Sequence, residues 1–234
     1  FNAAALRDWF GQLHGAAHVG ELNLLSHFAC ADERGSDVSE GQLEQFLELL
    51  DLDFAQRSLA NSAAILTIPA AHMDWLRPGI MLYGATPFAD LGAAELGLRP
   101  AMSLTAQLIA CRDIDAGDAV GYGGAWRATR PSRIGTVSCG YADGYPRHAP
   151  AGTPVIVRGQ RVALVGRVSM DMLTVDLTDV PEAGEGDAVE LWGAQLPVDE
   201  VAQAAGTIGY ELLSKVTARV PRRYRTSGSM VPIA

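Results

Sequence analysis

The spacing of hydrophobic residues changes once along this chain, near Leu98, and this change constrains the fold more than any other feature. Before it, apolar side chains recur every three or four residues, as in Leu43, Phe46, Leu47 and Leu50, which is the spacing of an amphipathic helix. After it, apolar and polar residues alternate, as in Ser103–Arg112, which is typical of a half-buried strand. The sequence therefore predicts two domains, over residues 1–95 and 96–234.

The first domain is predicted to alternate helices with short apolar strands. The strands are expected at Leu22–Ala29, Arg57–Ala60 and Trp75–Tyr83, and a capping box of Ser39 and Gln42 is expected before the helix over residues 43–50. Strands that alternate with helices form βαβ units with a parallel sheet. Three parallel strands cannot close a barrel, so we expect this part to be the end of a larger α/β domain.

The second domain is predicted to be mostly antiparallel. Its expected strands are Ser103–Arg112, Arg133–Gly140, Thr153–Gly166 with a hairpin turn at 158–160, and Met172–Thr178, and a helix is expected over Val198–Ala205. Short strands separated by Gly and Pro predict a small barrel or sandwich.

Charge and composition exclude several classes of protein. Lys and Arg number 18 against 27 Asp and Glu, a net charge of −9, which argues against nucleic-acid or anionic membrane partners. No apolar run approaches the ~20 residues that cross a bilayer. Cys30, Cys111 and Cys139 are far apart with no C-x-x-C, which favours a reducing, cytoplasmic compartment over a disulfide scaffold or a zinc site. The first residues resemble no signal peptide and lack Met, so we expect the chain to begin inside a longer protein.

Polar residues gather where predicted strands end. In the first domain these are Ser26–His27, Asn61–Ser62 and Arg77–Ile80; in the second they are Cys139–His148 and Gly166–Met172. The carboxyl ends of parallel barrel strands meet on one face, where small hydroxyl and glycine residues suit a phosphate. Each cluster alone also has a purely structural interpretation. Cys139–His148 can be a turn whose tyrosines pack on a core, Gly166–Met172 can carry a solvated aspartate, and Arg77 can be the partner in a salt bridge.

Taken together and in order, these clusters resemble one family, alanine racemase. The matching segments are SHFACAD (26–32), ANSAA (60–64), RPGIMLYGATPF (77–88), VGYGGAWRA (120–128), GYADGYPR (140–147), GRVSMDM (166–172), GYELL (209–213) and RVPR (219–222). The resemblance implies the last part of a (β/α)8 barrel followed by a mostly antiparallel β domain. It also implies a homodimer whose active sites combine the barrel of one subunit with the β domain of the other.

The activity that the resemblance implies is the interconversion of L-alanine and D-alanine on pyridoxal 5'-phosphate, by two-base proton transfer, for peptidoglycan synthesis or for alanine catabolism. The tyrosine base matches Tyr141. A histidine that hydrogen-bonds this tyrosine matches His27, and the arginine that faces the pyridine nitrogen matches Arg77. Since arginine keeps its proton, that nitrogen stays unprotonated and the ring is a weaker electron sink.

The same resemblance implies binding residues and no metal. The cofactor-binding residues match Asn61, Ser62, Gly79, Ile80 and Tyr210; the substrate carboxylate meets the backbone amide of Met170, beside Asp171; Arg167 and Asp32 match residues at the substrate entryway.

The chain departs from the family in one respect. Its single lysine, Lys215, follows GYELL and does not match the lysine that binds the cofactor and acts as the second base, which in the family lies upstream of the region matched here. We therefore expect this chain to be inactive without the N-terminal segment. Alternatives are a broad-specificity racemase, a pyridoxal-phosphate decarboxylase, in which an acid usually faces the ring nitrogen, and a non-enzymatic binding or assembly module.

Overall fold

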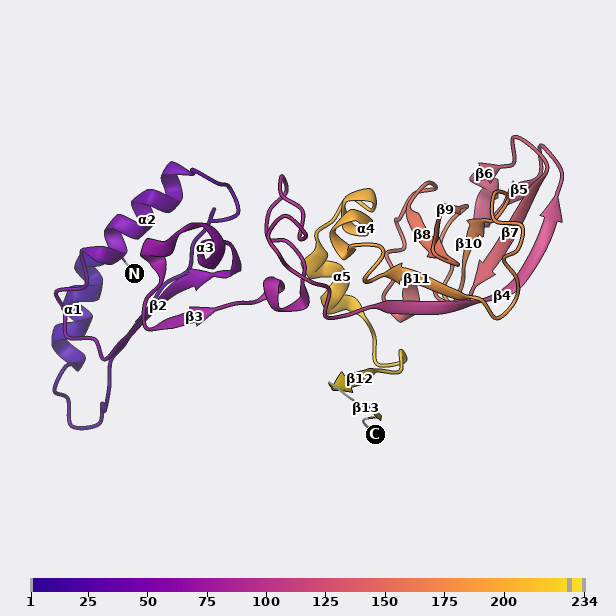
Figure 1. The fold of residues 1–234 in the computed structure, drawn as a ribbon. Coiled ribbons are helices and arrows are strands. Elements are labelled where there is room, and N and C mark those ends of the chain that lie inside the picture. Colours follow the sequence, from indigo (N-terminus) through magenta and orange to yellow (C-terminus); the bar gives the residue numbers. More distant parts are fainter. Residues whose placement is uncertain (1, 227–228, 233–234) are drawn as a thin grey trace. The chain divides into compact units, whose positions relative to one another are not determined.

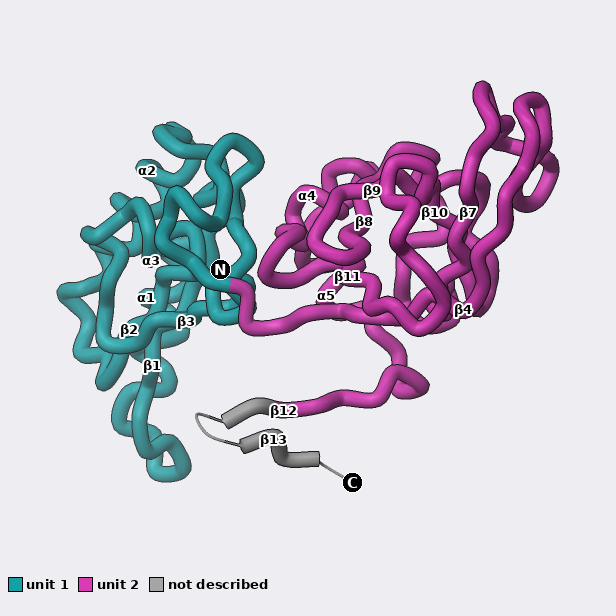
Figure 2. The backbone as a smooth tube through the Cα atoms, turned by 45° about the vertical axis from the view of Figure 1, so that its right-hand side comes forward, with its two compact units in different colours: residues 1–99 teal, residues 100–234 magenta. Residues whose placement is uncertain are grey.

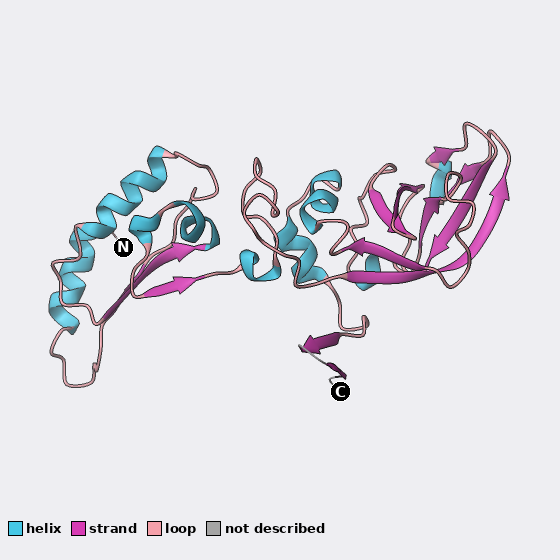
Figure 3. Cartoon of the chain, viewed as in Figure 1, coloured by secondary structure: helices cyan, strands magenta, loops and turns pink. Residues whose placement is uncertain are grey.

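The computed structural model describes residues 2–226 and 229–232, and these form two compact units, 1–99 and 100–234 (Figure 2). Helices and strands alternate in the first unit, whereas strands predominate in the second (Figure 3).

The first unit is a three-stranded parallel sheet with helices, in the order β1-β2-β3. Its elements are α1 (Ala3–Leu13), β1 (Asn23–Leu25), α2 (Asp37–Leu47), β2 (Gln56–Asn61), α3 (Ser62–Thr67), η1 (Pro69–Ala71), β3 (Trp75–Arg77) and η2 (Ile80–Tyr83) (Figure 1). The core contains Leu24, Phe46, Leu59 and Phe88, and the rings of Phe10 and Phe54 meet edge to face, 4.8 Å apart. The parallel arrangement confirms the predicted βαβ organisation.

Two local predictions for this unit are wrong. The strand expected over 75–83 ends at Arg77, because Pro78 lacks an N–H and cannot continue the ladder. The capping box is absent: α2 begins after Ser36, so Ser39 lies inside the helix. Gln42 instead holds the segment that follows β1, accepting a hydrogen bond from the N–H of Ala29 at 2.9 Å.

The second unit contains a closed barrel of antiparallel strands, in the order β10-β7-β4-β11-β8-β9, which confirms the predicted antiparallel domain. The barrel strands are β4 (Leu104–Ile114), β7 (Ser132–Val137), β8 (Pro154–Val157), β9 (Gln160–Val165), β10 (Leu173–Asp176) and β11 (Ala188–Trp192). Leu108, Ile134, Leu164 and Trp192 are fully buried inside this unit. The turn between β8 and β9 has positive φ at Arg158 and Gly159, as the two-residue hairpin requires.

The remaining elements of the second unit lie between and after these strands. They are β5 (Ala119–Val120), η3 (Tyr122–Gly124), β6 (Trp126–Arg127), η4 (Tyr141–Asp143), α4 (Val198–Ala204), α5 (Gly209–Lys215), β12 (Arg223–Thr226) and β13 (Ser229–Pro232). Helix α4 packs against β11 and α5. Among the described residues, none of the helices has the length and hydropathy needed to span a lipid bilayer.

Candidate active site

Arg77 is the most extensively bonded predicted site residue of the first unit. It ends β3, beside Asn61 at the end of β2. Its Nε donates to Ser58 Oγ at 3.0 Å, and its Nη2 donates to the carbonyl oxygens of Leu59, at 3.1 Å, and of Ser26. Its Nη1 lies 2.9 Å from Nδ1 of His27. Since a guanidinium has five N–H bonds, one Nη1 hydrogen is left without an acceptor among the described residues.

The contact with Arg77 fixes the tautomer of His27. Arginine can only donate, so Nδ1 of His27 accepts and its ring proton lies on Nε2. The backbone of His27 is held as well, because its carbonyl accepts a hydrogen bond from Gln42 Nε2 at 3.3 Å. His27 is exposed, so its Nε2–H can donate to a group outside this unit.

Ser62 and the turn after β3 form a second polar cluster at the same end of the sheet. Ser62 is buried, and its Oγ accepts hydrogen bonds from the N–H groups of Gly79, at 2.8 Å, and of Met81, at 3.4 Å. The hydroxyl hydrogen of Ser62 and the N–H of Ile80 have no partners among the described residues. Donors left unsatisfied at a partly buried site fit a phosphate.

Asn61 has a structural task in this cluster. Its Oδ1 accepts a hydrogen bond from the N–H of Ala64 at 3.0 Å and so caps α3, whose first residue is Ser62. The side chain of Asn61 therefore orients Ser62.

In the second unit, the loop that carries Tyr141 lies directly on the loop that carries Met170. The N–H of Tyr141 donates to the carbonyl of Ser169 at 3.0 Å, and the N–H of Ala142 donates to that of Met170 at 2.9 Å. Gly140 makes this approach possible, because a Cβ there would lie 2.3 Å from the Met170 oxygen. The N–H of Met170 has no partner within the described part of the chain, as its predicted contact with a substrate carboxylate requires.

Arg219 joins the same two loops through their aspartates. Its Nε lies 3.1 Å from Asp143 Oδ1, and its Nη2 donates to Asp171 Oδ1 at 2.7 Å. The hydrogen bond to Asp171 and the charge of Asp143 raise the pKa of Arg219 above its usual value.

A second tyrosine loop contacts the other end of the 166–172 segment. Tyr122 begins η3 between Gly121 and Gly123, both at positive φ, and a Cβ at Gly121 would lie 2.9 Å from the backbone nitrogen of Arg167. Tyr122 is 69% exposed against 39% for Tyr141. Sequence reasoning gave Tyr122 no role, although its glycine-rich setting in VGYGG was a signal.

Tyr210 lies on α5 and is half exposed. Next to it in α5, Glu211 forms a hydrogen-bonded ion pair with the Lys215 ammonium. This hydrogen bond and a second one from Thr207 lower the pKa of the Glu211 carboxyl.

A cavity of about 240 Å³ lies between α5 and the Tyr141 loop, lined by Tyr141, Tyr145, His148 and Lys215 among others. Tyr145 itself is buried and stacks on Trp192, so one tyrosine of GYADGYPR belongs to the core.

Asp32, which is predicted with Arg167 to lie at the substrate entryway, is exposed after β1 in the first unit.

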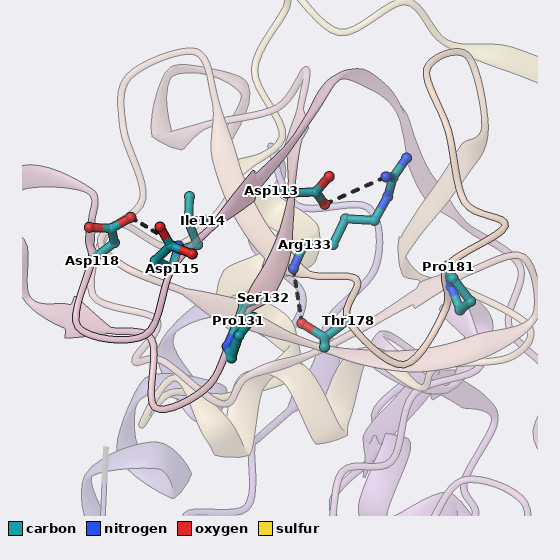
Figure 4. Close-up of a pocket in the computed structure, with 9 residues that line it drawn as sticks. All are labelled: Asp113, Ile114, Asp115, Asp118, Pro131, Ser132, Arg133, Thr178 and Pro181. Carbon is teal, nitrogen blue, oxygen red and sulfur yellow. Dashed lines mark hydrogen bonds and ion pairs between the residues drawn. The ribbon is translucent and has the colours of Figure 1, made fainter.

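A cavity of about 490 Å³ in the second unit contains none of the predicted site residues; Figure 4 shows Asp113, Arg133 and Thr178 among its lining residues. The described residues contain no cluster of His, Cys, Asp and Glu that could bind a metal ion.

Comparison with known proteins identifies the family. The family model described as alanine racemase, N-terminal domain, matches residues 1–87, and the model described as alanine racemase, C-terminal domain, matches residues 101–224. The chain belongs to the alanine racemase family.

Individual alanine racemases match over nearly the whole chain. It is 74% identical over 224 residues to "Alanine racemase, biosynthetic" from Pseudomonas aeruginosa, covering 96% of this chain and 63% of that protein. A crystal structure of biosynthetic alanine racemase from Pseudomonas aeruginosa aligns with a TM-score of 0.94 at 73% identity, over 97% of this chain and 63% of that one.

A more distant structure bears on the cofactor. The alanine racemase from Bartonella henselae with covalently bound pyridoxal phosphate is 35% identical and aligns with a TM-score of 0.76, over 84% of this chain and 55% of that one. The chain thus spans less than two thirds of the length of these alanine racemases.

Proposed function

We propose that this chain is the C-terminal part of an alanine racemase that interconverts L-alanine and D-alanine with pyridoxal 5'-phosphate. The observation that carries this proposal is the bonding of Arg77, which leaves one guanidinium hydrogen beside His27 and near the Ser62 cluster. A group that is held so firmly at the end of a parallel strand is preorganised for a ligand.

The residues present fit the cofactor. The Ser62 hydroxyl and the N–H of Ile80 would hold its phosphate, with Tyr210 as a further ligand. The N–H of Gly79 donates to Ser62 Oγ and would orient that hydroxyl, and the spare Nη1 hydrogen of Arg77 would face the ring nitrogen. When bound, the cofactor supplies an electron sink that stabilises the carbon from which the α-proton has been removed. Arg77 keeps that sink weak, because it does not give its proton to the ring nitrogen.

The residues of the β unit would act on the substrate. The Met170 N–H would bind the carboxylate, and Arg167 would lie at the entryway together with Asp32 of the first unit. Tyr141 is proposed as the base on one face, as the sequence resemblance implies. Tyr122 is a second candidate, because its larger exposure suits a group that reaches into the barrel of another subunit.

The proposed fold is the last part of a (β/α)8 barrel, residues 1–95, joined to the β domain, residues 96–234. Its support is a parallel sheet whose large apolar side chains remain exposed: Leu25 at 63%, Trp75 at 58% and Leu76 at 42%. Parallel sheets are normally covered on both faces, so these side chains fit additional strands and helices. A homodimer with shared active sites follows from the same proposal.

The lysine that binds the cofactor must come from an N-terminal segment outside this chain. Lys215 does not fit that role, because its ammonium is paired with Glu211. The word "biosynthetic" in the name of the Pseudomonas aeruginosa relative supports D-alanine supply. Use of that D-alanine for peptidoglycan and a cytoplasmic location are further parts of the proposal.

The test compares this chain alone with the chain joined to the N-terminal segment of its relatives. The joined protein should show cofactor absorbance and L-to-D alanine exchange, and the chain alone should show neither. A joined protein that lacks both would contradict the proposal and favour a binding or assembly module. Exchange of several amino acids at similar rates would indicate a broad-specificity racemase.

A further inference from the structure

Arg219 lies where three segments that carry proposed site residues meet. These are the Tyr141 loop, the 166–172 loop with Met170, and the segment that follows α5 and Tyr210. We propose that Arg219 is a positioning residue that sets the spacing between Tyr141 and the Met170 amide by bridging Asp143 and Asp171. This inference rests on the proposed function and concerns the geometry of that same site.

The first half of the bridge is firmly placed. The Asp143 side chain is only 14% exposed, and its Oδ2 accepts a hydrogen bond from the N–H of Gly140 at 2.9 Å while Oδ1 faces Arg219. Asp143 therefore connects Arg219 to the residue immediately before Tyr141. This largely covered carboxylate needs the cation, because an unpaired charge at such a position is costly.

The segment that carries Arg219 is itself fastened to the Tyr141 loop. The hydroxyl of Thr217 donates to the carbonyl of Ala142 at 2.8 Å, and its N–H donates to that of Asp143 at 3.1 Å. Gly144 allows this contact, because a Cβ there would lie 2.4 Å from the carbonyl oxygen of Lys215. The backbone of the segment that carries Arg219 is therefore held in place beside Asp143.

The second half of the bridge reaches Asp171, which is 53% exposed and follows Met170 directly. Exposed ion pairs contribute little to stability on their own. The contact with Asp171 is therefore better explained as orientation of the Met170 peptide than as a source of stability. A planar guanidinium can serve both aspartates at once through Nε and Nη2, whereas a lysine ammonium on its flexible stem lacks this fork.

The experiment uses the full-length protein with the N-terminal segment of its relatives, and compares Arg219→Lys and Arg219→Ala with Arg130→Ala. Arg130 is a matched control: it forms a 2.6 Å ion pair with Asp179 in the same unit, and its side chain is 53% exposed against 49% for Arg219. Two readouts are taken: kcat and KM for alanine in both directions, and hydrogen exchange at the amides of Tyr141 and Ala142.

We expect both Arg219 variants to raise KM by about tenfold or more, because a misplaced binding group costs this much or more. Exchange at Tyr141 and Ala142 should accelerate by a similar factor, while Arg130→Ala should resemble the wild type in both readouts. If Arg219→Lys keeps the KM and the slow exchange of the wild type, a positive charge suffices and the bridge is refuted. If Arg219→Ala lowers only the melting temperature, Arg219 is merely structural and the proposal is also overturned.

This test separates the inference from the proposed function. A wild-type full-length protein without racemase activity would contradict the proposed function. The exchange measurement would still decide whether Arg219 holds the two loops together.

Discussion

The Nη1 atom of Arg77 and the Nδ1 atom of His27 lie 2.9 Å apart, joining the ends of β3 and β1 across the sheet. This contact is one of several through which Arg77 contacts β2 and the segment that follows β1, so the orientation of the arginine depends on residues outside its own strand. Ser58 is the clearest of these: it is buried, accepts from Arg77 Nε, and donates to the carbonyl of Trp75 at 3.0 Å.

Ser58→Ala should lower the free energy of unfolding of the first unit by about 1–2 kcal/mol, because two partly buried hydrogen-bonding groups lose their partner. Urea titration followed by circular dichroism measures this. Ser36→Ala is the matched control, since the Ser36 side chain makes no capping hydrogen bond to α2 and its loss should change little. Equal effects of the two substitutions would contradict the role of Ser58.

Replacing each tyrosine separately should identify the base of the β unit. In the full-length enzyme, the Phe variant of the true base should lose about 10²-fold or more in kcat with the cofactor still bound, because one face loses its proton-transfer group. The Phe variant of the other tyrosine should retain most of the activity. Tyr141→Phe tests the role that the sequence resemblance implies for Tyr141, and Tyr122→Phe tests the candidate that its exposure suggests. Near-normal rates in both variants would remove both tyrosines from the chemistry.

Gly140→Ala should destabilise the second unit by about 1–3 kcal/mol, since an added methyl would be driven into the Met170 carbonyl and overpacks the contact. Gly184→Ala is the control, because a Cβ there meets nothing within 4 Å. Thermal unfolding of the two variants gives the comparison. A Gly140→Ala protein as stable as Gly184→Ala would show that the two loops can separate freely.

The second unit should lose stability in alkaline solution. Burial, together with the charge of Asp143, raises the pKa of the Cys139 thiol to about 12, and burial also raises the pKa of the Tyr145 hydroxyl. A raised pKa means that the folded state favours the protonated thiol. The stability that this preference adds to the folded state is fully present below pH ~9 and is lost as the pH rises towards 12. For Cys139 the loss is up to about 4 kcal/mol, from a shift of roughly three pH units.

Denaturant unfolding at pH 8, 9.5 and 11 measures this decline. The Cys139→Ala variant should show a shallower dependence on pH between 9 and 11, whatever its stability at pH 8. Parallel curves for the variant and the wild type would mean that Cys139 ionises equally in both states.

The sequence predicted the architecture well because the architecture depends on periodicity. Alternation of apolar residues was enough to place β4, β8 and β9, and the apolar run at 22–29 located β1, although only Asn23–Leu25 forms the strand. The contacts that orient the site were not predictable in this way. Gln42 looked like a capping residue and instead holds the loop of His27, while Ser58 carried no signal apart from its place in a strand.

The same limit applies to the β unit. Arg219 was visible only as part of RVPR, because its link to Asp143 spans 76 positions in the sequence and depends on how three loops fold together. Gly140 was visible as part of a turn, but its close approach to Met170 is a property of the tertiary fold. Charge and spacing locate candidate groups, whereas partners distant in sequence determine their orientation.

The parallel sheet of the first unit and the barrel of the second end differently, and this difference bears on how the protein behaves during synthesis. The barrel of the second unit closes on itself and offers no unpaired strand, whereas β1 and β3 each present a row of unpaired peptide groups along an open side. Such open sides recruit further strands from other molecules and promote aggregation. Residues 100–234 produced without the first unit should therefore remain dispersed at concentrations where the 234-residue chain precipitates, unless the latter is made together with strands that cover β1 and β3.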